Sequence, residues 1–541
     1  MTGVRYKQEV KFAMKILVSD PLSAEGIEIL KQHAEVTEKD YSDPNLLKEV
    51  IGDYDALIVR SGTKVTAEVI EAGKKLRVIG RAGVGVDNID VPKATEKGIV
   101  VINAPEGNTI SAAEHTVALI TALARNIFEA NASMKKGEWN RKQFLGVELN
   151  HKVLGIVGLG RIGSEVARRC RAMGMKIIAY DPYISAEQAE KIGVTMVPLE
   201  EVYRRSDFIS LHLPLNNATY HLIGDEQLAM MKQGVRIVNC ARGGLIDEEA
   251  LCRALESGKV AGAALDVFEM EPPSQCPLVK YDNVIMTPHL GASTREAQVN
   301  VAVQVAKQVL EALNGAPVCC AVNVPIVLPD VMADINPFMP LMHLMGSLYM
   351  QVFNGSVEEV EIHYSGEIAD KTLAPLTTSC LIGILEVMVG NQVNYVNAPV
   401  LARSRGIRIK EISTSNGGNF SNLITLSITT GGVKNVISGT LFNHDDMRIV
   451  QIGNYHIEVV PTRYMLICNY EDKPGVIGKV ATVLGNHNIN IGSMQVGRQH
   501  VGGEAVMALQ LDDPIPADVL NILNEIKLII NLRFVELPER N

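Results

Sequence analysis

The chain has 541 residues, a length that favours several domains over one. Its composition, 47% hydrophobic and 21% charged, is ordinary for a globular protein with a large core. The net charge of −10 argues against a nucleic-acid-binding protein with a broad basic surface, and no apolar run is long enough to predict a membrane span.

The N-terminus and the cysteines indicate the compartment. Residues 1–13 are polar and basic, so we interpret them as a leader, or as an upstream start before Met14, and not as a signal peptide. The eight cysteines show no C-x-x-C pair and no spacing typical of a zinc site or a disulfide framework. We therefore expect a reducing, cytoplasmic location and no metal.

From Met14 to about residue 320, short β-branched runs alternate with amphipathic stretches. This alternation predicts βαβ units around mostly parallel sheets. The alanine-rich stretch 109–130 predicts one long helix that links two such units. The expected strands include 15–18, 56–59, 153–157, 176–180, 208–211 and 236–239.

The C-terminal third has a different pattern. Prolines cluster between 314 and 329, and the segment 330–460 then mixes helices with alternating strands. After Pro461 the order strand, helix, strand, strand, helix, strand predicts a ferredoxin-like βαββαβ unit. Its expected elements are 464–469, 475–486, 489–496, 504–511, 516–528 and 531–537.

A G-x-G-x-x-G motif begins at Gly158, between a predicted strand and a predicted helix. Gly158 permits a tight turn, Gly160 lets the backbone approach a pyrophosphate, and Gly163 lets the helix pack on the strand. The helix N-terminus then faces the phosphates. Asp181, after the next strand, can bind the ribose hydroxyls and repel a 2′-phosphate, so the pattern predicts NAD. A packing loop without a ligand is the alternative.

Three polar residues then follow predicted strand ends: Arg242, Glu271 and His289. A histidine is suited to accept the proton of a secondary alcohol near neutral pH. Glu271 would orient the histidine ring and favour its imidazolium form. Arg242 would grip a substrate carboxylate and polarise the carbonyl of the oxidised product. Taken singly, each motif is also common in ordinary turns and loops.

The order of these motifs resembles the D-2-hydroxyacid dehydrogenase family over residues 14–325. The resemblance implies that Arg242, Glu271 and His289 are the catalytic set for hydride transfer. It adds further cofactor contacts, from Arg161, Ile162, Cys240 and Asp266. It also implies an α/β fold of two doubly wound lobes, in which a Rossmann NAD-binding domain (108–292) is inserted in a flavodoxin-like substrate-binding domain (14–107 and 293–325).

Within this family, the motifs around Arg60, Arg81 and Trp139 resemble those of members that oxidise 3-phosphoglycerate to 3-phosphohydroxypyruvate, the first step of L-serine biosynthesis. That substrate carries a carboxylate and a phosphate and requires cationic ligands, although Arg60, Lys64 and Arg141 can also be solvated charges. The expected substrate contacts are Arg60, Ser61, Gly83, Val84, Asn108 and Arg141. The alternatives are a glyoxylate or hydroxypyruvate reductase of the same family, and an NAD-sensing binding protein without catalysis.

The C-terminal segments resemble regulatory modules. Residues 463–541 resemble an ACT domain, which implies L-serine as a feedback effector bound by Tyr470, Asp472 and Asn490; a fold used only for dimerisation is the alternative. Residues 326–460 resemble an α+β intervening domain. Its basic run, 403–410, is either a solvated face or an anion-binding allosteric site. The family also suggests a homotetramer.

Overall fold

The computed structural model describes residues 14–538 apart from 275, 317, 319, 325–328, 372, 391 and 444. The interpretation of residues 1–13 therefore lies outside the described residues. The chain divides into two compact units, the first built mainly from residues up to Asn314 and the second mainly from residues after it.

The first unit begins with a five-stranded sheet in the order β2-β1-β3-β4-β5, in which β1 pairs in parallel with both β2 and β3. This order is that of flavodoxin-like doubly wound sheets. Strand β3 is buried along its whole length, as expected for a strand covered on both faces. The elements are β1 (Lys15–Val18), α1 (Ala24–Lys31), β2 (Glu35–Glu38), α2 (Pro44–Val50), β3 (Ala56–Val59), α3 (Ala67–Ala72), β4 (Val78–Arg81), α4 (Val91–Glu96) and β5 (Val100–Ile102).

A seven-stranded parallel sheet follows, in the order β12-β11-β10-β9-β6-β7-β8. The chain direction across the sheet reverses between β6 and β9, and ligands bind outside the carboxyl ends of strands at such a switch point. The elements are α5 (Thr109–Ala124), α6 (Ile127–Lys135), β6 (Val153–Val157), α7 (Arg161–Ala172), β7 (Lys176–Tyr180), α8 (Ala186–Lys191), β8 (Thr195–Met196), α9 (Leu199–Arg205), β9 (Phe208–Leu211), α10 (Asp225–Met230), β10 (Val235–Asn239), α11 (Glu248–Glu256), β11 (Val260–Leu265) and β12 (Val284–Met286).

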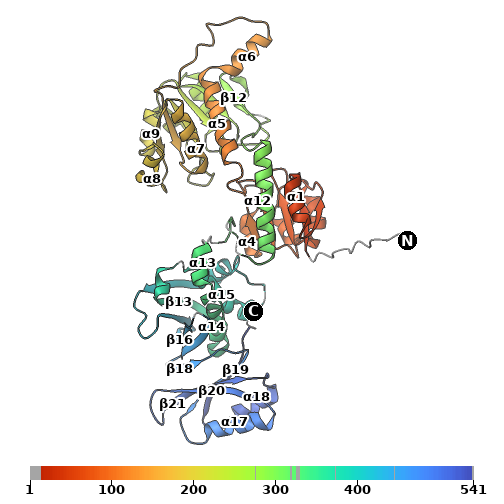
Figure 1. Cartoon of the computed structure of the whole chain (residues 1–541), viewed down its shortest axis with the longest axis vertical. Coiled ribbons are helices and arrows are strands. Elements are labelled where there is room, and N and C mark those ends of the chain that lie inside the picture. The colour runs from red at the N-terminus through yellow and green to blue at the C-terminus, as the bar shows by residue number, and fades with distance from the viewer. Residues whose placement is uncertain are drawn as a thin grey trace, which may run out of the picture. The chain divides into compact units, whose positions relative to one another are not determined.

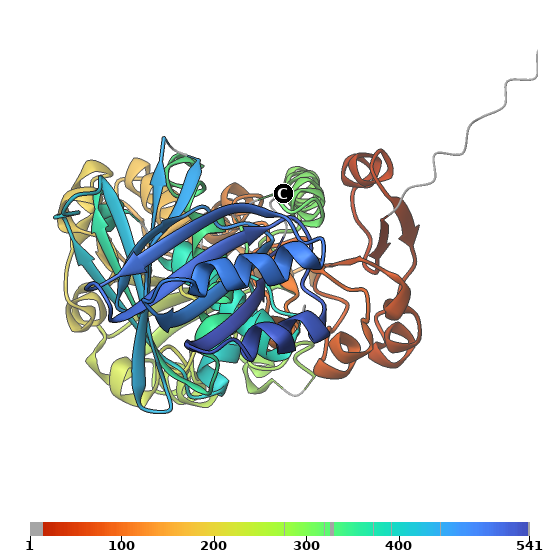
Figure 2. The same cartoon turned by 90° about the horizontal axis from the view of Figure 1, so that it is seen from below.

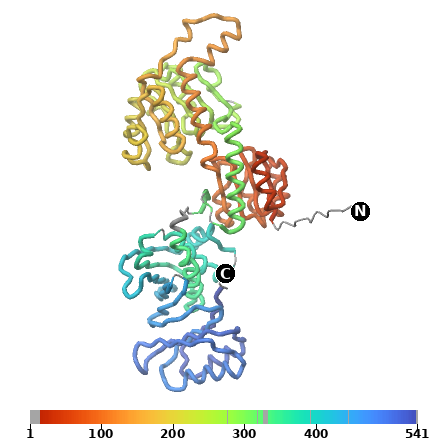
Figure 3. Tube along the Cα trace, in the orientation of Figure 1, coloured from red at the N-terminus to blue at the C-terminus, as the bar shows by residue number. Residues whose placement is uncertain are grey.

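The prediction of one helix over 109–130 is wrong. Helix α5 ends at Ala124 and α6 begins at Ile127. Between them Asn126 has a φ of 50°, in the left-handed region. A residue in that conformation ends a right-handed helix, and asparagine tolerates it better than most residues. Beyond α6 the chain runs through an extended loop, which the orange trace in Figure 3 follows.

Helix α12 (Arg295–Leu313) returns the chain to the first sheet, where it lies beside α1 (Figure 1). The two helices approach closely at Gly26, since a Cβ there would lie 2.8 Å from the Cβ of Ala302.

The second unit contains a mixed six-stranded sheet in the order β14-β13-β15-β16-β17-β18. Helices α14 and α15 pack on one face of this sheet and share a large apolar core with it. The elements are α13 (Pro329–Ile335), α14 (Phe338–Phe353), β13 (Val357–Gly366), α15 (Ala374–Val389), α16 (Ala398–Ser404), β14 (Arg408–Thr414), β15 (Asn422–Thr430), β16 (Val433–Phe442), β17 (Asp446–Ile452) and β18 (Tyr455–Val459).

The last sheet is antiparallel, in the order β20-β21-β19-β22, and confirms the expected βαββαβ unit. Helices α17 and α18 cover one face, as Figure 2 shows. The other face joins the apolar core of the six-stranded sheet through Met465, Ile467, Val506, Ala508 and Val535. The elements are β19 (Tyr464–Glu471), α17 (Val476–Asn486), β20 (Ile491–Arg498), β21 (Glu504–Leu511), α18 (Ala517–Asn524) and β22 (Ile529–Glu536).

No helix in the described part of the chain combines the length and the apolar character needed to cross a membrane.

Candidate active site

The glycine loop lies between β6 and α7, at the switch point of the seven-stranded sheet. Gly158 has a φ of 95°, and a side chain there would collide with the backbone of His212. A side chain at Gly163 would collide with the carbonyl of Gly158. A Cβ at Gly160 would meet nothing within 4 Å, so the outer side of the loop is open. The loop therefore fits a dinucleotide pyrophosphate at the start of α7.

Asp181 follows β7 and faces the glycine loop. Its Oδ2 accepts a hydrogen bond from the backbone N–H of Leu159 at 2.8 Å, and its Oδ1 accepts one from Tyr183 at 2.9 Å. The carboxylate therefore lies against the glycine loop, an arrangement that fits NAD.

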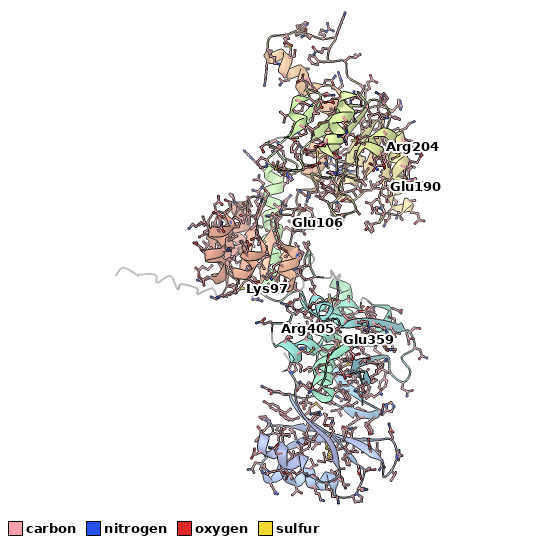
Figure 4. The ribbon with its side chains drawn as sticks, turned by 180° about the vertical axis from the view of Figure 1, so that it is seen from behind. Lys97, Glu106, Glu190, Arg204, Glu359 and Arg405 are labelled. Atoms are coloured by element: carbon pink, nitrogen blue, oxygen red, sulfur yellow. The ribbon has the colours of Figure 1, made fainter. Side chains whose placement is uncertain are left out.

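The other expected cofactor contacts lie around the same edge of the sheet. Arg161 is exposed at the first turn of α7 and pairs with Glu106, labelled in Figure 4, at 3.4 Å. Ile162 packs against the apolar core behind the loop. Cys240 directly follows β10, and burial raises the pKa of its thiol to about 12. Asp266 follows β11 and is completely buried.

His289 and Glu271 form a direct pair. Nδ1 of His289 lies 2.8 Å from Oε2 of Glu271, and Oε1 of Glu271 accepts a hydrogen bond from Phe268 N at 3.2 Å. Burial alone would raise the pKa of Glu271, but the hydrogen bond and charge of His289 outweigh it and hold this pKa below its ordinary value. Glu271 is therefore ionised, and Nε2 of His289 is left to exchange a proton with a ligand.

Arg242 follows β10 and reaches across to the first sheet. Its Nε lies 3.0 Å from Oδ2 of Asp87, and its Nη1 donates to the carbonyl of Ala241 at 2.6 Å. The next residue, Gly243, approaches the backbone of Phe268 so closely that a side chain there would collide with it. The loop carrying Arg242 thus lies on the segment that leads to Glu271, although no described hydrogen bond or ion pair joins Arg242 to His289.

The Arg60 loop follows β3 and is held from both sides. Asp20 accepts hydrogen bonds from the backbone N–H groups of Arg60 at 2.5 Å and Thr63 at 3.2 Å. Asn88 donates to the carbonyls of the same two residues at 2.7 and 2.6 Å. Ser61 is exposed in this loop. These four hydrogen bonds fix the backbone that carries the Arg60 side chain.

Arg81, at the end of β4, is a residue that sequence reasoning missed. Burial lowers the pKa of its guanidinium to about 10, and the charges of Arg242 and Arg60 add to this effect while Asp87 and Asp20 oppose it. Its buried Nε has no hydrogen-bond partner among the described residues. The charges of Arg60 and Arg242 thus both act on Arg81, and the three residues are called the cationic cluster below. The position of Arg81 at the end of an apolar strand was the signal that could have identified it.

The remaining expected substrate contacts differ in their surroundings. The carbonyls of Gly83 and Val84 accept hydrogen bonds from Ala104 N at 2.8 Å and from Asn103 Nδ2 at 2.6 Å. Asn108 precedes α5, and its buried Oδ1 has no partner among the described residues. Arg141 is exposed in the loop after α6, and no described contact brings it to the cationic cluster.

In the ACT-like unit the three expected effector residues have different surroundings. The ring of Tyr470 is 1% exposed, and its buried hydroxyl has no hydrogen-bond partner among the described residues. Asp472 lies 3.3 Å from Nη1 of Arg498. Asn490 donates to Asp512 at 2.7 Å. Of the three, the Asn490 side chain is exposed and the Asp472 side chain is partly exposed, so only these two are accessible to a ligand from solvent.

The basic run 403–410 is partly neutralised. Arg408 and Lys410 contact the two carboxylate oxygens of Glu359 at 3.1 and 3.0 Å. Glu359 and Arg405 are labelled in Figure 4. Because Arg408 and Lys410 share one carboxylate on an exposed sheet edge, the solvated face is the better interpretation of this run.

Comparisons with known proteins show which families the chain matches. Family models match at residues 117–291 (D-isomer specific 2-hydroxyacid dehydrogenase, NAD binding domain), 334–453 (D-3-phosphoglycerate dehydrogenase intervening domain) and 464–528 (ACT domain). The chain is 48% identical to a D-3-phosphoglycerate dehydrogenase of Synechocystis sp. over 95% of this chain and 93% of that protein. It is 47% identical to one of Methanocaldococcus jannaschii over 97% and 100%. A D-lactate dehydrogenase of Aquifex aeolicus solved with NAD and lactic acid is 32% identical, with a TM-score of 0.50, over 56% of this chain and 96% of that one.

Proposed function

Because the chain belongs to the D-3-phosphoglycerate dehydrogenase family, we propose that it uses NAD to oxidise 3-phosphoglycerate to 3-phosphohydroxypyruvate, the first step of L-serine biosynthesis. It is an NAD-dependent oxidoreductase. The single observation that supports this reaction best is the His289–Glu271 pair at 2.8 Å, at the same carboxyl edge of the parallel sheet as a glycine loop that fits a dinucleotide.

In this proposal the Gly158 loop would hold the pyrophosphate of NAD and Asp181 its adenosine ribose, and the cofactor would supply the acceptor for the hydride at C2 of the substrate. His289 takes the hydroxyl proton at Nε2, while Glu271 orients the ring through Nδ1 and stabilises the imidazolium that forms. In the reverse direction His289 returns that proton. Arg242 holds the carboxylate beside C2 through its planar donor fork.

Within the cationic cluster, the substrate's phosphate is assigned to Arg60 and Arg81 and its carboxylate to Arg242. Three guanidinium groups in one region suit a ligand with two anionic groups, since a glyoxylate or lactate carboxylate requires only one. The backbone of Gly83 and Val84 and the side chain of Asn108 lie at the ends of neighbouring elements and are proposed as further ligands, together with Ser61.

The test is NADH oxidation by purified protein with phosphohydroxypyruvate, compared with glyoxylate and hydroxypyruvate. We expect turnover of the phosphorylated acid and its loss in His289→Ala. Turnover of the small acids alone would leave a different D-2-hydroxyacid dehydrogenase. Dinucleotide binding with no turnover of any 2-keto acid would leave an NAD-sensing protein.

Feedback inhibition by L-serine is a proposal that the ACT domain supports. Asp472 offers a carboxylate for an ammonium group, and Asn490 lies on the segment before β20. Because the ring of Tyr470 is buried, we assign it a role in the packing beneath the serine site and not a direct contact with serine. An initial rate that serine leaves unchanged, in a protein that turns over phosphohydroxypyruvate, would refute the regulation and leave the enzyme assignment intact.

We also propose that the chain forms a homo-oligomer, a tetramer by family resemblance. The segment from α6 to residue 145 carries several large apolar side chains that are about half exposed or more: Ile127, Phe128, Met134, Trp139 and Leu145. Such a patch favours burial against a second copy, where Arg141 and Lys142 would then lie near the interface. Sedimentation at low protein concentration tests this.

The domain division given above is likewise a proposal, supported by family matches that fall within 108–292, 326–460 and 463–541. A cytoplasmic location is proposed from the thiols of Cys170, Cys240, Cys252, Cys276, Cys380 and Cys468, which form no disulfide.

A further inference from the structure

Helix α5 is attached twice to the loop 287–294, which carries His289. Ser111 Oγ lies 2.7 Å from Thr294 Oγ1. One turn later, His115 Nε2 lies 3.3 Å from both Thr287 Oγ1 and Asp266 Oδ1. Residues four apart share one face of a helix, so this face of α5 holds both ends of the loop.

Asp266 is the centre of the attachment. Its carboxylate is completely buried and accepts hydrogen bonds from Thr287 Oγ1 at 2.6 Å, Leu290 N at 2.7 Å and Gly291 N at 2.8 Å. Burial alone would raise the pKa of Asp266, but these bonds, together with that of His115, hold it below its ordinary value. A buried carboxylate of this kind depends on every donor it has.

The hydrogen bonds around His115 require a hydrogen on its Nε2. Thr287 has a single hydroxyl hydrogen, which it donates to Asp266. Its oxygen can therefore only accept from His115. The ionised Asp266 is also an acceptor only, so both contacts of His115 require an N–H at Nε2.

Asp266 also fixes the backbone of His289. The N–H of His289 donates to the carbonyl of Asp266 at 3.0 Å. His289 has a φ of 56°, a left-handed conformation that is uncommon for a residue other than glycine. Such a conformation persists only where the surroundings hold it, and here Asp266 bonds to His289 and to the two residues after it.

We propose that His115 is a positioning residue for the dehydrogenation: from α5 it holds Asp266, and through Asp266 the loop that aims His289, with Ser111 securing the far end of that loop. The proposal rests on the proposed function. His115 does not touch the reacting atoms. It acts on the alignment of the base, and small displacements of a catalytic group reduce the chemical step strongly.

The experiment compares His115→Phe, which keeps the ring shape without a donor, with His115→Gln, whose amide can donate in place of Nε2. We expect the phenylalanine variant to lower kcat for phosphohydroxypyruvate about tenfold, or about 1.4 kcal/mol, with KM within about twofold. Glutamine should restore most of kcat. The NADH Kd from fluorescence titration should stay within about threefold in both. Glu114→Gln changes the residue directly before His115 on α5; it is the matched control and should leave kcat unchanged.

Ser111→Ala is a second variant that removes one oxygen and should lower kcat about two- to threefold. It carries the test if His115→Phe does not fold. Equal losses in the phenylalanine and glutamine variants, a loss confined to KM or to melting temperature, or an unchanged Ser111→Ala variant would overturn the proposal. A wild-type protein that fails to turn over any 2-keto acid would instead overturn the proposed function.

Discussion

Nδ1 of His289 is 2.8 Å from Oε2 of Glu271, so the ring nitrogen on the far side, Nε2, is the one left for a substrate. The two residues come from separate loops, after β12 and after β11. The carboxylate is fixed in turn by the backbone N–H of Phe268 at 3.2 Å. Tautomer and ring orientation are thus set before a ligand arrives.

Replacement of Glu271 by glutamine should lower kcat about 10- to 100-fold with little change in KM, because the imidazolium formed in the reaction loses its charged partner. Steady-state kinetics with phosphohydroxypyruvate measure this. The matched control is Glu269→Gln, which breaks the neighbouring carboxylate–histidine pair with His221 at 3.0 Å outside the site. Equal losses in the two variants would contradict the assigned role.

Removal of Arg60 should discriminate between substrates. We expect Arg60→Ala to raise KM for phosphohydroxypyruvate about 10- to 100-fold, because a charge-assisted contact to the phosphate is lost. Any residual activity with hydroxypyruvate should change little. The control is Lys64→Ala, an exposed charge in the same segment. Similar KM changes for the phosphorylated and unphosphorylated acids would place the phosphate elsewhere.

Cofactor preference should depend on Asp181. In Asp181→Asn, which keeps the shape and one acceptor oxygen, the ratio of kcat/KM for NADH over NADPH should fall about tenfold or more, because the repulsion of a 2′-phosphate is removed. Initial rates with each cofactor measure it. Glu187→Gln removes a nearby charge that makes no contact with the glycine loop and serves as control. An unchanged ratio would show that Asp181 acts only on the backbone of Leu159 and Tyr183.

Acid stability should depend on His212, whose Nε2 lies 2.9 Å from Ser210 Oγ and whose pKa burial lowers from 6.5 to about 4. Between these values the unfolded chain binds more protons than the folded one, so stability falls as pH falls. Glutamine takes up no proton, so the melting temperature of His212→Gln should fall less than that of the wild type between about pH 7.5 and about pH 5. His487→Gln, an exposed histidine, is the control. An identical pH dependence in the wild type and His212→Gln would refute this.

The sequence predicted the parallel sheets well, because their short buried strands, such as 56–59 and 153–157, are continuous apolar runs. Such runs are typical of strands that are covered on both faces. It did not predict the break at Asn126, since alanine-rich periodicity continues on both sides and only the left-handed φ ends the helix. Helix propensity is local, whereas the break depends on where α5 and α6 pack.

Most site residues at strand ends were found by their motifs, but Arg81 was not, and neither were the residues that act by holding other residues in place. Asp20, Asp87 and His115 are common residue types without a motif of their own, and their partners are distant in sequence. Tyr470 shows the opposite limit: its place in a motif suggested a ligand contact, but alternation along β19 turns its ring into the core.

The ACT sheet shares one face with the core of the preceding six-stranded sheet through Met465, Ile467, Val506, Ala508 and Val535. Neither sheet is therefore expected to form an independent domain, because cutting the chain near Pro461 would expose a continuous apolar surface on both fragments. We therefore expect either fragment, expressed alone, to aggregate.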